Sequence, residues 1–599
     1  MLERLSDFWP FLAVATGVAT LPLLLNVLRG FLDRKLVGDV FNVAAVVACL
    51  ATGQWVTAAL IVAIAHLGAL LERKAAIRAG HDARALAEAQ PLTATRERHK
   101  QTEEVKTEGL SIGDILVVQQ GQRVPADGVI IQGTAHVDQS ALSGEIKPIE
   151  KLVGDGVLAS NIVKAGHIKL RVTRTLQGSA IERILFLLQD AGRHPAPVER
   201  AAERLSGLFL VGMGLAGLAA WLLLQDVNLM AAFFLIAGGD ALAQTIRLLI
   251  ATTLARGARH GTVIKHGRWI EPLAELNAII LEKTGLMTHA DLHVGRLEHD
   301  PSVSDAFVWE CVAVAEKYSE HPAGRALFRM AAKHIGAMPD PDEFQVFPSK
   351  GVRAILAGHE VMVGTAELLR AREISFDQPW LAGSTSPIEG TGSDVFVALD
   401  GSCIARVRLQ DRPRNDIRES LQRLHELGIQ TQILFTNDTV RVAGSFAQAI
   451  GISEYRPSMK PEDTWHEIGR LAQHGTVALL GDSQQHTSAL VRADLGVVLS
   501  QAGRGLHTES AGLVLMTDDL TRMPELILLA RRTKRTWKYL ILYWLVANVL
   551  WVSLVLLKVL APLPTAIFAL LVLRLPLLNA SRWMEKRAVG GQAAQIGGK

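Results

Sequence analysis

The chain has 599 residues, of which 49% are hydrophobic and 20% are charged, and its mean hydropathy is +0.24. This length leaves room for several domains, and the hydropathy argues against an ordinary soluble protein. The formal net charge of +3 is too small to indicate a nucleic-acid-binding protein. The three cysteines form no C-x-x-C pair, so they indicate neither a disulfide framework nor a thiolate metal cluster.

Seven apolar runs are candidates for membrane-spanning helices, and several reach the roughly 20 residues that a helix needs to cross the hydrocarbon core. Basic residues follow the first and third runs, precede the sixth and follow the last. The positive-inside rule places such segments in the cytoplasm. The sequence therefore predicts a multi-pass protein of a bacterial-type inner (plasma) membrane, with its large domains in the cytoplasm. The runs lie at 9–30, 38–53, 55–72, 206–224, 228–251, 537–558 and 560–579.

Two non-membrane blocks differ in pattern. Residues 75–200 contain short strand-like runs bounded by Gly, Asp and Pro, which is typical of a small β-rich domain. Residues 258–535 alternate strand-like and helix-like segments, which predicts a doubly wound, Rossmann-like sheet with an α+β insertion. The fold class is thus a multi-domain α/β membrane protein. We predict three helices over 8–74, the β-rich domain over 75–200, two helices over 201–257, the sheet domain over 258–289 and 405–535, its insertion over 290–404, two helices over 536–582 and a cytoplasmic tail over 583–599.

Short motifs follow one another along these segments. The stretch from Val137 to Glu145 reads Val-Asp-Gln-Ser-Ala-Leu-Ser-Gly-Glu, and residues 281–288 read Leu-Glu-Lys-Thr-Gly-Leu-Met-Thr. The pairs His321-Pro322 and Gly481-Asp482 and the triplet Thr436-Asn437-Asp438 come later in the chain.

With this order of domains, the motifs resemble the heavy-metal (type IB) branch of the P-type ATPases over residues 10–585. The resemblance implies that the β-rich domain is an actuator domain. It also implies that the sheet domain is a haloacid-dehalogenase-like (HAD-like) phosphorylation domain and that its insertion binds ATP.

The resemblance also exposes a set of substitutions around the phosphorylation loop. Where the family has the Asp that takes the γ-phosphate of ATP, this chain has Glu282, followed by Lys283 and Thr284. The longer stem displaces the reacting oxygen, and a displacement of roughly 1 Å can cost on the order of 100-fold in rate. Three further changes, each of a group that serves phosphoryl transfer, are Leu286 for a Thr, Thr464 for a Lys, and Gln485 with His486 for an Asn and an Asp. Together they predict lost autophosphorylation.

Other positions match the family, which implies that ATP and Mg²⁺ binding can persist. Asp482 is the expected Mg²⁺ ligand, and Glu145 matches the residue that positions the hydrolytic water. The alternative for Glu145 is a charged loop tip or a domain contact. The nucleotide-contacting positions are His321, Pro322, Gly351, Gly364, Thr436 and Asp438.

The membrane segment before the phosphorylation domain has lost the Cys-Pro-Cys motif of this branch. Without thiolates or a methionine cluster, no Cu⁺ site is expected. Asp240 remains near the middle of the span, where a carboxylate is costly and faces a cavity or a partner. It is either a ligand for a hard cation or a proton, or half of a structural contact with Arg247. Glu72 and Glu203 match acidic positions at the family's cytoplasmic ion entry, or else are ordinary charged helix ends.

Three functions remain open at this level. The leading hypothesis is a pseudo-ATPase that serves as scaffold, regulator or assembly partner for an unidentified protein in the membrane. The second is a slow or altered ATP-driven transporter of a divalent cation that uses Glu282 as phosphate acceptor and Asp240 as membrane ligand. The third is a passive cation path that needs Asp240 but not Glu282.

Overall fold

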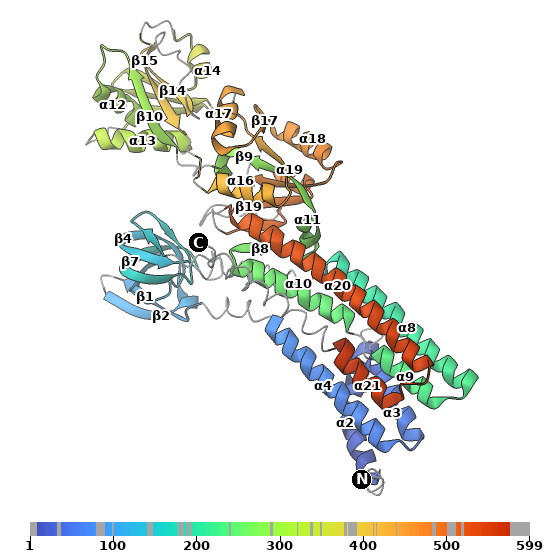
Figure 1. The fold of residues 1–599 in the computed structure, drawn as a ribbon. Coiled ribbons are helices and arrows are strands. Elements are labelled where there is room, and N and C mark those ends of the chain that lie inside the picture. The colour runs from blue at the N-terminus through green and yellow to red at the C-terminus, as the bar shows by residue number, and fades with distance from the viewer. Residues whose placement is uncertain are drawn as a thin grey trace, which may run out of the picture.

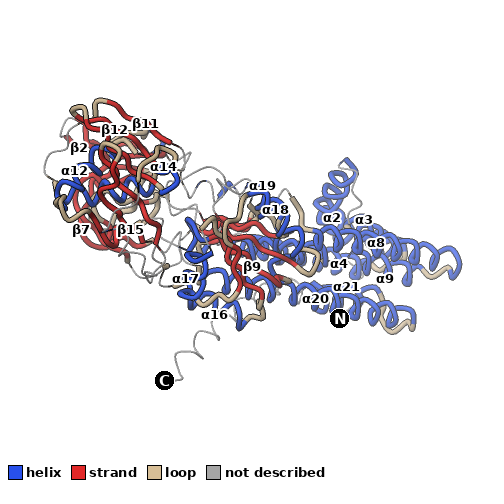
Figure 2. The backbone as a smooth tube through the Cα atoms, turned by 90° about the horizontal axis from the view of Figure 1, so that it is seen from above, coloured by secondary structure: helices blue, strands red, loops and turns tan. Residues whose placement is uncertain are grey.

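The computed structural model describes most of residues 9–574 and divides into a helical bundle and three β-containing domains (Figure 1). Seen from above, the helical bundle occupies one end of the molecule and the β-containing domains the other (Figure 2). The stretches outside the description are 1–8, 33–37, 80–89, 99–100, 140–147, 176–178, 180–181, 183–184, 187–189, 191–193, 239–240, 288–291, 320, 336–339, 348–349, 376–379, 381–391, 411–412, 415, 439, 482–486, 500–510, 517–519 and 575–599.

Each of the seven apolar runs forms helix. Among the described residues, five helical stretches are long and apolar enough to span a membrane, and α3 and α21 are shorter. Apolar side chains such as Phe11 and Leu208, 75% and 73% exposed, cover the outside of the bundle, as expected where lipid is the solvent. The bundle consists of α2 (Trp9–Leu32), α3 (Asp39–Ala51), α4 (Trp55–Ala79), α8 (Pro197–Leu224), α9 (Val227–Gly238), α10 (Leu242–Arg259), α20 (Arg522–Leu556), α21 (Pro562–Phe568) and a π-helical turn, η6 (Ala569–Arg574).

The predicted β-rich domain is one antiparallel sheet in the order β2-β1-β3-β7-β4-β5, with β6 paired to β4. Alternate side chains of its long strands point inward, so Val137, Ile168 and Leu170 are fully buried. The strands are β1 (Thr93–Arg98), β2 (Gln101–Lys106), β3 (Ile115–Val118), β4 (Asp127–Asp138), β5 (Ile149–Lys151), β6 (Gly156–Val157) and β7 (Ile162–Arg174), with a short helical turn η1 (Thr107–Gly109).

The predicted doubly wound sheet, here the parallel-sheet domain, has the order β17-β16-β9-β18-β19-β20-β8. All neighbours are parallel except β8, which is antiparallel to β20. Its strands are β8 (Thr262–Ile264), β9 (Leu276–Glu282), β16 (Thr431–Phe435), β17 (Glu454–Arg456), β18 (Thr476–Gly481), β19 (Leu495–Leu499) and β20 (Leu513–Leu515). Its helical elements are η3 (Gly267–Trp269), α11 (Ile270–Ala274), η4 (Lys283–Met287), α16 (Ile417–Glu426), α17 (Val440–Ile450), α18 (Pro461–Leu471) and α19 (Thr487–Arg492).

The inserted domain is a six-stranded sheet in the order β10-β15-β14-β13-β12-β11. The predicted boundary at residue 404 falls inside β15 and needs correction. This strand pairs with β10 and β14 up to Gln410, so its second half belongs to the insertion. The elements are β10 (His293–His299), α12 (Asp305–Glu316), α13 (Pro322–His334), β11 (Glu343–Phe347), β12 (Gly351–Leu356), β13 (His359–Gly364), α14 (Ala366–Arg370), β14 (Gly392–Leu399) and β15 (Ser402–Gln410).

The β-rich domain packs against the edge of the parallel-sheet domain. Ala159, in the turn between β6 and β7, forms one apolar cluster with Ala258 of α10, Val263 of β8 and Val514 of β20. All four side chains are at most 2% exposed. This cluster, hereafter the docking cluster, joins the β-rich domain to the parallel-sheet domain.

Candidate functional site

The predicted phosphorylation loop begins at the carboxyl end of β9, a central strand of the parallel sheet. This edge is where α/β sheets bind ligands. Residues Lys283–Met287 form the π-helical turn η4 directly after the strand. The sequence Leu-Asn-Ala-Ile-Ile-Leu before Glu282 is a nearly continuous apolar run, as expected for a strand covered on both faces, and five of its six residues are buried.

Glu282 is itself buried, with 7% of its surface exposed. Its carboxylate lies against Gly481 at the end of β18, where a Cβ atom would collide with the Glu282 oxygens. The longer side chain is therefore accommodated by a neighbour that has no side chain.

Lys283 is held by a small polar network. Its Nζ lies 2.7 Å from Oδ2 of Asp438, and the Oγ1 of Thr436 donates to the same oxygen at 2.8 Å. The backbone N–H of Asp438 donates in turn to Thr436 Oγ1 at 3.1 Å. The structure thus brings Lys283 together with Thr436 and Asp438, which lie more than 150 positions later in the sequence.

The substituted positions near this network turn their side chains into the protein core. Leu286 is fully buried and belongs to the main apolar core of the parallel-sheet domain and the helices. Thr464 is 1% exposed, and its hydroxyl donates to the carbonyl of Lys460 one helical turn earlier in α18, at 3.1 Å. Neither residue presents a cation or a hydroxyl toward the loop.

Several predicted site residues lie outside the described residues or have undescribed side chains. Glu145 and Asp240 lie outside, and so do Asp482, Gln485 and His486 of the hinge motif. Thr284 takes part in η4 and Pro322 opens α13, but their side chains lie outside the described part of the structure.

A cavity of about 380 Å³ lies in the inserted domain, and three of the predicted nucleotide-binding residues line it. It falls within the roughly 300–1,000 Å³ of small-molecule sites. His321, Gly351 and Gly364 all line it. Gly351 has φ of +148°, and a Cβ there would meet the backbone of Val363 and Gly364. Only glycine fits that position.

Two further residues of this cavity were not predicted from the sequence. Glu316, at the end of α12, is 6% exposed, and burial raises its pKa to about 7 although a hydrogen bond with Ser319 acts against the shift. Lys350 lines the mouth and pairs with Glu367 at 2.8 Å. Glu316 ends α12, and His321 stands just before α13, five residues later. This short spacing from the His-Pro pair is the sequence signal that could have identified Glu316.

His321 caps the helix that follows it. Its Nδ1 accepts a hydrogen bond from the N–H of Ala323 at 3.2 Å. Desolvation, and then the charge of Arg325, lower the pKa of His321. The neutral imidazole that this capping bond requires is therefore favoured.

In its described residues, the membrane run predicted at 228–251 forms two helices, and Ala241 before the second is not helical. The first, α9, ends at Gly238 and α10 begins at Leu242. Asn42 of α3 donates from its Nδ2 to the carbonyl of Gly238 at 3.4 Å. Beside the break lies a cavity of about 20 Å³ lined by Asn42, Ala65, Leu235 and Gly238 among others, enough for about one water molecule.

The predicted acidic entry residues have different surroundings. Glu72 is half-buried near the end of α4. Glu203 of α8 forms an ion pair with Arg247 of α10. The described partner of Arg247 is thus Glu203, which the sequence analysis did not anticipate because the two residues are 44 positions apart.

Comparison with known protein families matches two parts of the chain. Residues 88–189 match the model of the P-type ATPase actuator domain. Residues 276–494 match that of the haloacid dehalogenase-like hydrolases. The two matches cover the β-rich domain and most of the parallel-sheet domain with its insertion.

Curated relatives extend the likeness over most of the chain. A probable copper-exporting P-type ATPase V of Mycobacterium tuberculosis is 30% identical over 80% of this chain and 63% of its own length. The chain thus spans less than two thirds of that relative. A probable cobalt/nickel-exporting P-type ATPase of Mycolicibacterium smegmatis is 29% identical over 85% of this chain and 78% of its own length.

Among solved structures, the crystal structure of a zinc-transporting PIB-type ATPase in the E2.Pi state has a TM-score of 0.58 at 26% sequence identity. The match covers 96% of this chain and 95% of that one. The likeness therefore includes the helical bundle as well as the three β-containing domains.

Proposed function

We propose that this chain is a pseudo-ATPase. It has the fold of the heavy-metal P-type ATPases, which are multi-pass membrane proteins with large cytoplasmic domains. In this proposal it binds a nucleotide but does not transfer phosphate to itself. It acts in the membrane as a scaffold, regulator or assembly partner for another protein.

One observation carries the proposal. The side chain that stands where the family has a phosphate-steadying lysine, Thr464, is buried and bonded back to its own helix. Phosphoryl transfer depends on positioning and on neutralising developing charge. With Leu286 buried and Lys283 paired to Asp438, the described residues offer little of either.

The cavity in the inserted domain supports retained nucleotide binding. His321, Gly351 and Gly364 still surround a space of ligand size. ATP and Mg²⁺ are general ligands of the family, and Asp482 would hold the ion here. The carboxylate oxygens of Glu282 are of the hard type that Mg²⁺ prefers, so the residues present fit that ion.

The first test is transfer of labelled γ-phosphate from ATP to the purified, detergent-solubilised chain across several divalent metals, with Glu282→Ala as control. We expect no hydroxylamine-sensitive label in either protein. Binding of a fluorescent ATP analogue, measured in the same preparations, is expected in both. Label that is present in the natural chain and lost in Glu282→Ala would refute the proposal.

The helix break at Gly238 favours a second candidate, a slow ATP-driven cation transporter. Broken membrane helices expose backbone carbonyls that coordinate cations at transport sites, and the break between α9 and α10 persists without the Cys-Pro-Cys motif. This candidate predicts ATP-dependent metal uptake into vesicles that contain only this chain. This uptake should be lost in both Asp240→Asn and Glu282→Ala. A passive path would instead give metal flux without ATP, and that flux would be lost in Asp240→Asn but not in Glu282→Ala.

A further inference from the structure

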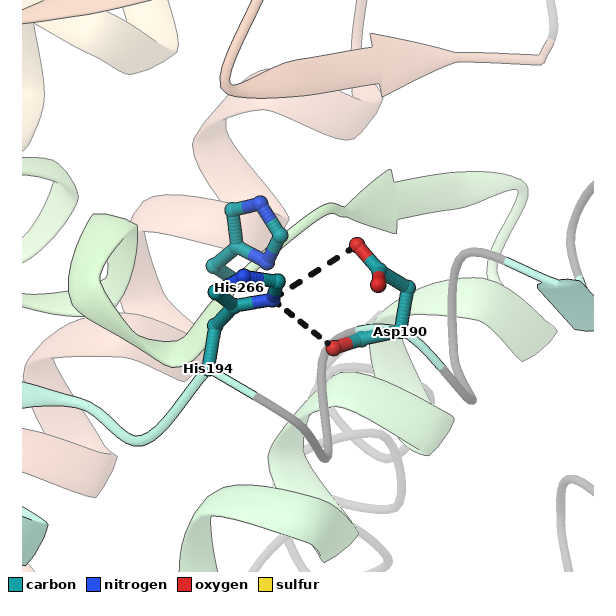
Figure 3. A group of neighbouring side chains, drawn as sticks. All are labelled: Asp190, His194 and His266. Atoms are coloured by element: carbon teal, nitrogen blue, oxygen red, sulfur yellow. Dashed lines mark hydrogen bonds and ion pairs between the residues drawn. The ribbon is translucent and has the colours of Figure 1, made fainter.

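Three side chains with metal-binding groups meet where two segments cross, away from the sites described above. Asp190 and His194 precede α8, and His266 lies between β8 and η3. One ligand atom from each residue lies within 4.8 Å of the others. Figure 3 shows both imidazole rings beside the Asp190 carboxylate.

The geometry needs only a small closure to hold an ion. Nδ1 of His194 is 3.7 Å from Oδ2 of Asp190, and the two imidazole centroids are 4.8 Å apart. Tetrahedral Zn²⁺ with bonds of about 2.1 Å places its ligand atoms roughly 3.4 Å apart. The side chains of Asp190 and His194 are 30% and 60% exposed, so both have room to rotate inward.

His266 is the least satisfied member of the group. Its Nδ1 is buried and has no hydrogen-bond partner among the described residues. Arg268 and Lys265 add positive charge near this imidazole, and the Asp190 carboxylate offsets part of it.

We propose that Asp190, His194 and His266 form a binding site for a divalent transition-metal ion of the Zn²⁺ type. Two imidazoles and one carboxylate are a ligand set that Zn²⁺ uses when a fourth position is left to water. The absence of sulfur among these three ligands disfavours Cu⁺.

The bound ion would tie the segment that leads from the β-rich domain into α8 to the edge of the parallel-sheet domain. These segments already touch, since a Cβ on Gly267 would lie 3.1 Å from Cβ of Ala196 and 3.4 Å from Oε1 of Glu199. The ion would therefore restrain movement of the β-rich domain. This inference goes beyond the proposed function and does not depend on it.

The test is titration of the full chain in detergent with Co²⁺, whose visible absorption reports tetrahedral coordination, followed by displacement with Zn²⁺. It is done in an Asp240→Asn background to remove any contribution from the membrane segment. We expect one site whose affinity falls at least tenfold (roughly the cost of disturbing a metal site) in His194→Ala and in His266→Ala. His194→Cys should retain the site, with a new thiolate charge-transfer band.

The matched control is His260→Ala, which removes an exposed histidine at the end of α10 and should titrate like the unmutated site. Zn²⁺ should also raise the thermal midpoint of the control but not of His194→Ala, because an ion stabilises only the state that binds it. Since His194 is exposed, its replacement leaves the core intact. Equal Co²⁺ titrations in His194→Ala, His266→Ala and the control would overturn the proposal.

Discussion

In the phosphorylation loop, Glu282 keeps a carboxyl group at the position of the family's nucleophile, but the residues around it differ from those of the family. Glu282 retains a carboxylate at the end of β9, and Gly481 provides the space that it occupies. The groups that would act on a phosphate around it have turned to other partners. Thr464 bonds to its own helix, and Lys283 bonds to Asp438.

Glu282→Asp alone should therefore not restore phosphorylation. The shorter side chain returns the family's nucleophile, but Leu286 and Thr464 still offer no group to the phosphate. We expect γ-phosphate labelling to stay at the level of Glu282→Ala, measured on the purified chain with Mg²⁺. Labelling of Glu282→Asp well above that background would favour the slow transporter instead.

Glu316 makes the inserted domain sensitive to pH. Its pKa is raised from 4.5 to about 7 by burial, so the folded state binds more protons than the unfolded state between these values. Stability must then fall as pH rises through this window, by roughly 3 kcal/mol in total. We expect Glu316→Gln to remove this fall, because the amide stays neutral and can still hydrogen-bond with Ser319.

Hydrogen exchange of α12 and α13 at about pH 5 and pH 8, corrected for the intrinsic rate, measures this opening free energy. Glu310→Gln is the matched control, because Glu310 is exposed on the same helix and should leave the slope unchanged. If the opening free energy changes equally between pH 5 and pH 8 in Glu316→Gln and in the unmutated chain, the argument is contradicted.

At the scale of elements, the end of α9 lies in close contact with α3. A Cβ on Gly238 would collide with the buried amide of Asn42. We expect Gly238→Ala to destabilise the bundle by about 1–3 kcal/mol through overpacking. Gly17→Ala on α2, where nothing lies within 4 Å, should instead stabilise by up to about 1 kcal/mol. Thermal midpoints in detergent at one scan rate compare the two, and a Gly238→Ala midpoint at or above that of the unmutated chain would count against the contact.

The elements that sequence reasoning found are those with strong local patterns. The apolar runs, the β-rich block and the alternation of strand-like and helix-like segments in the second block all follow from periodicity and turn residues. The boundary at 404 failed because the second half of β15 is defined by its pairing with β10, which local sequence does not encode.

The same distinction holds for the site. Motifs identified His321, Gly351 and Gly364 as binding residues, and the structure places them around one cavity. The pair Glu203–Arg247 and the group around His266 arise only from tertiary packing. No local sequence pattern predicts such contacts, so the sequence alone could not reveal them.

For the molecule as a whole, the docking cluster is the contact that sets the relation between the β-rich and parallel-sheet domains. Its four small or β-branched side chains leave no room for a larger group, since Ala159 and Val263 are fully buried. If the chain is the pseudo-ATPase that we propose, no covalent step is available to drive these domains apart. The arrangement should then be the resting one, with or without nucleotide.

Ala159→Arg should open this contact, because burying an unpaired charge costs more than separating the two surfaces. We expect faster deuterium uptake in β8 and in residues 157–163 of the β-rich domain. Ile112→Arg introduces the same charge into the same domain at a position that is 72% exposed, and uptake there should match the unmutated chain. Adding ATP to the unmutated chain should change neither segment. An ATP-dependent rise in deuterium uptake at β8 would mean that nucleotide binding drives the domains apart. That result would contradict the expected resting arrangement.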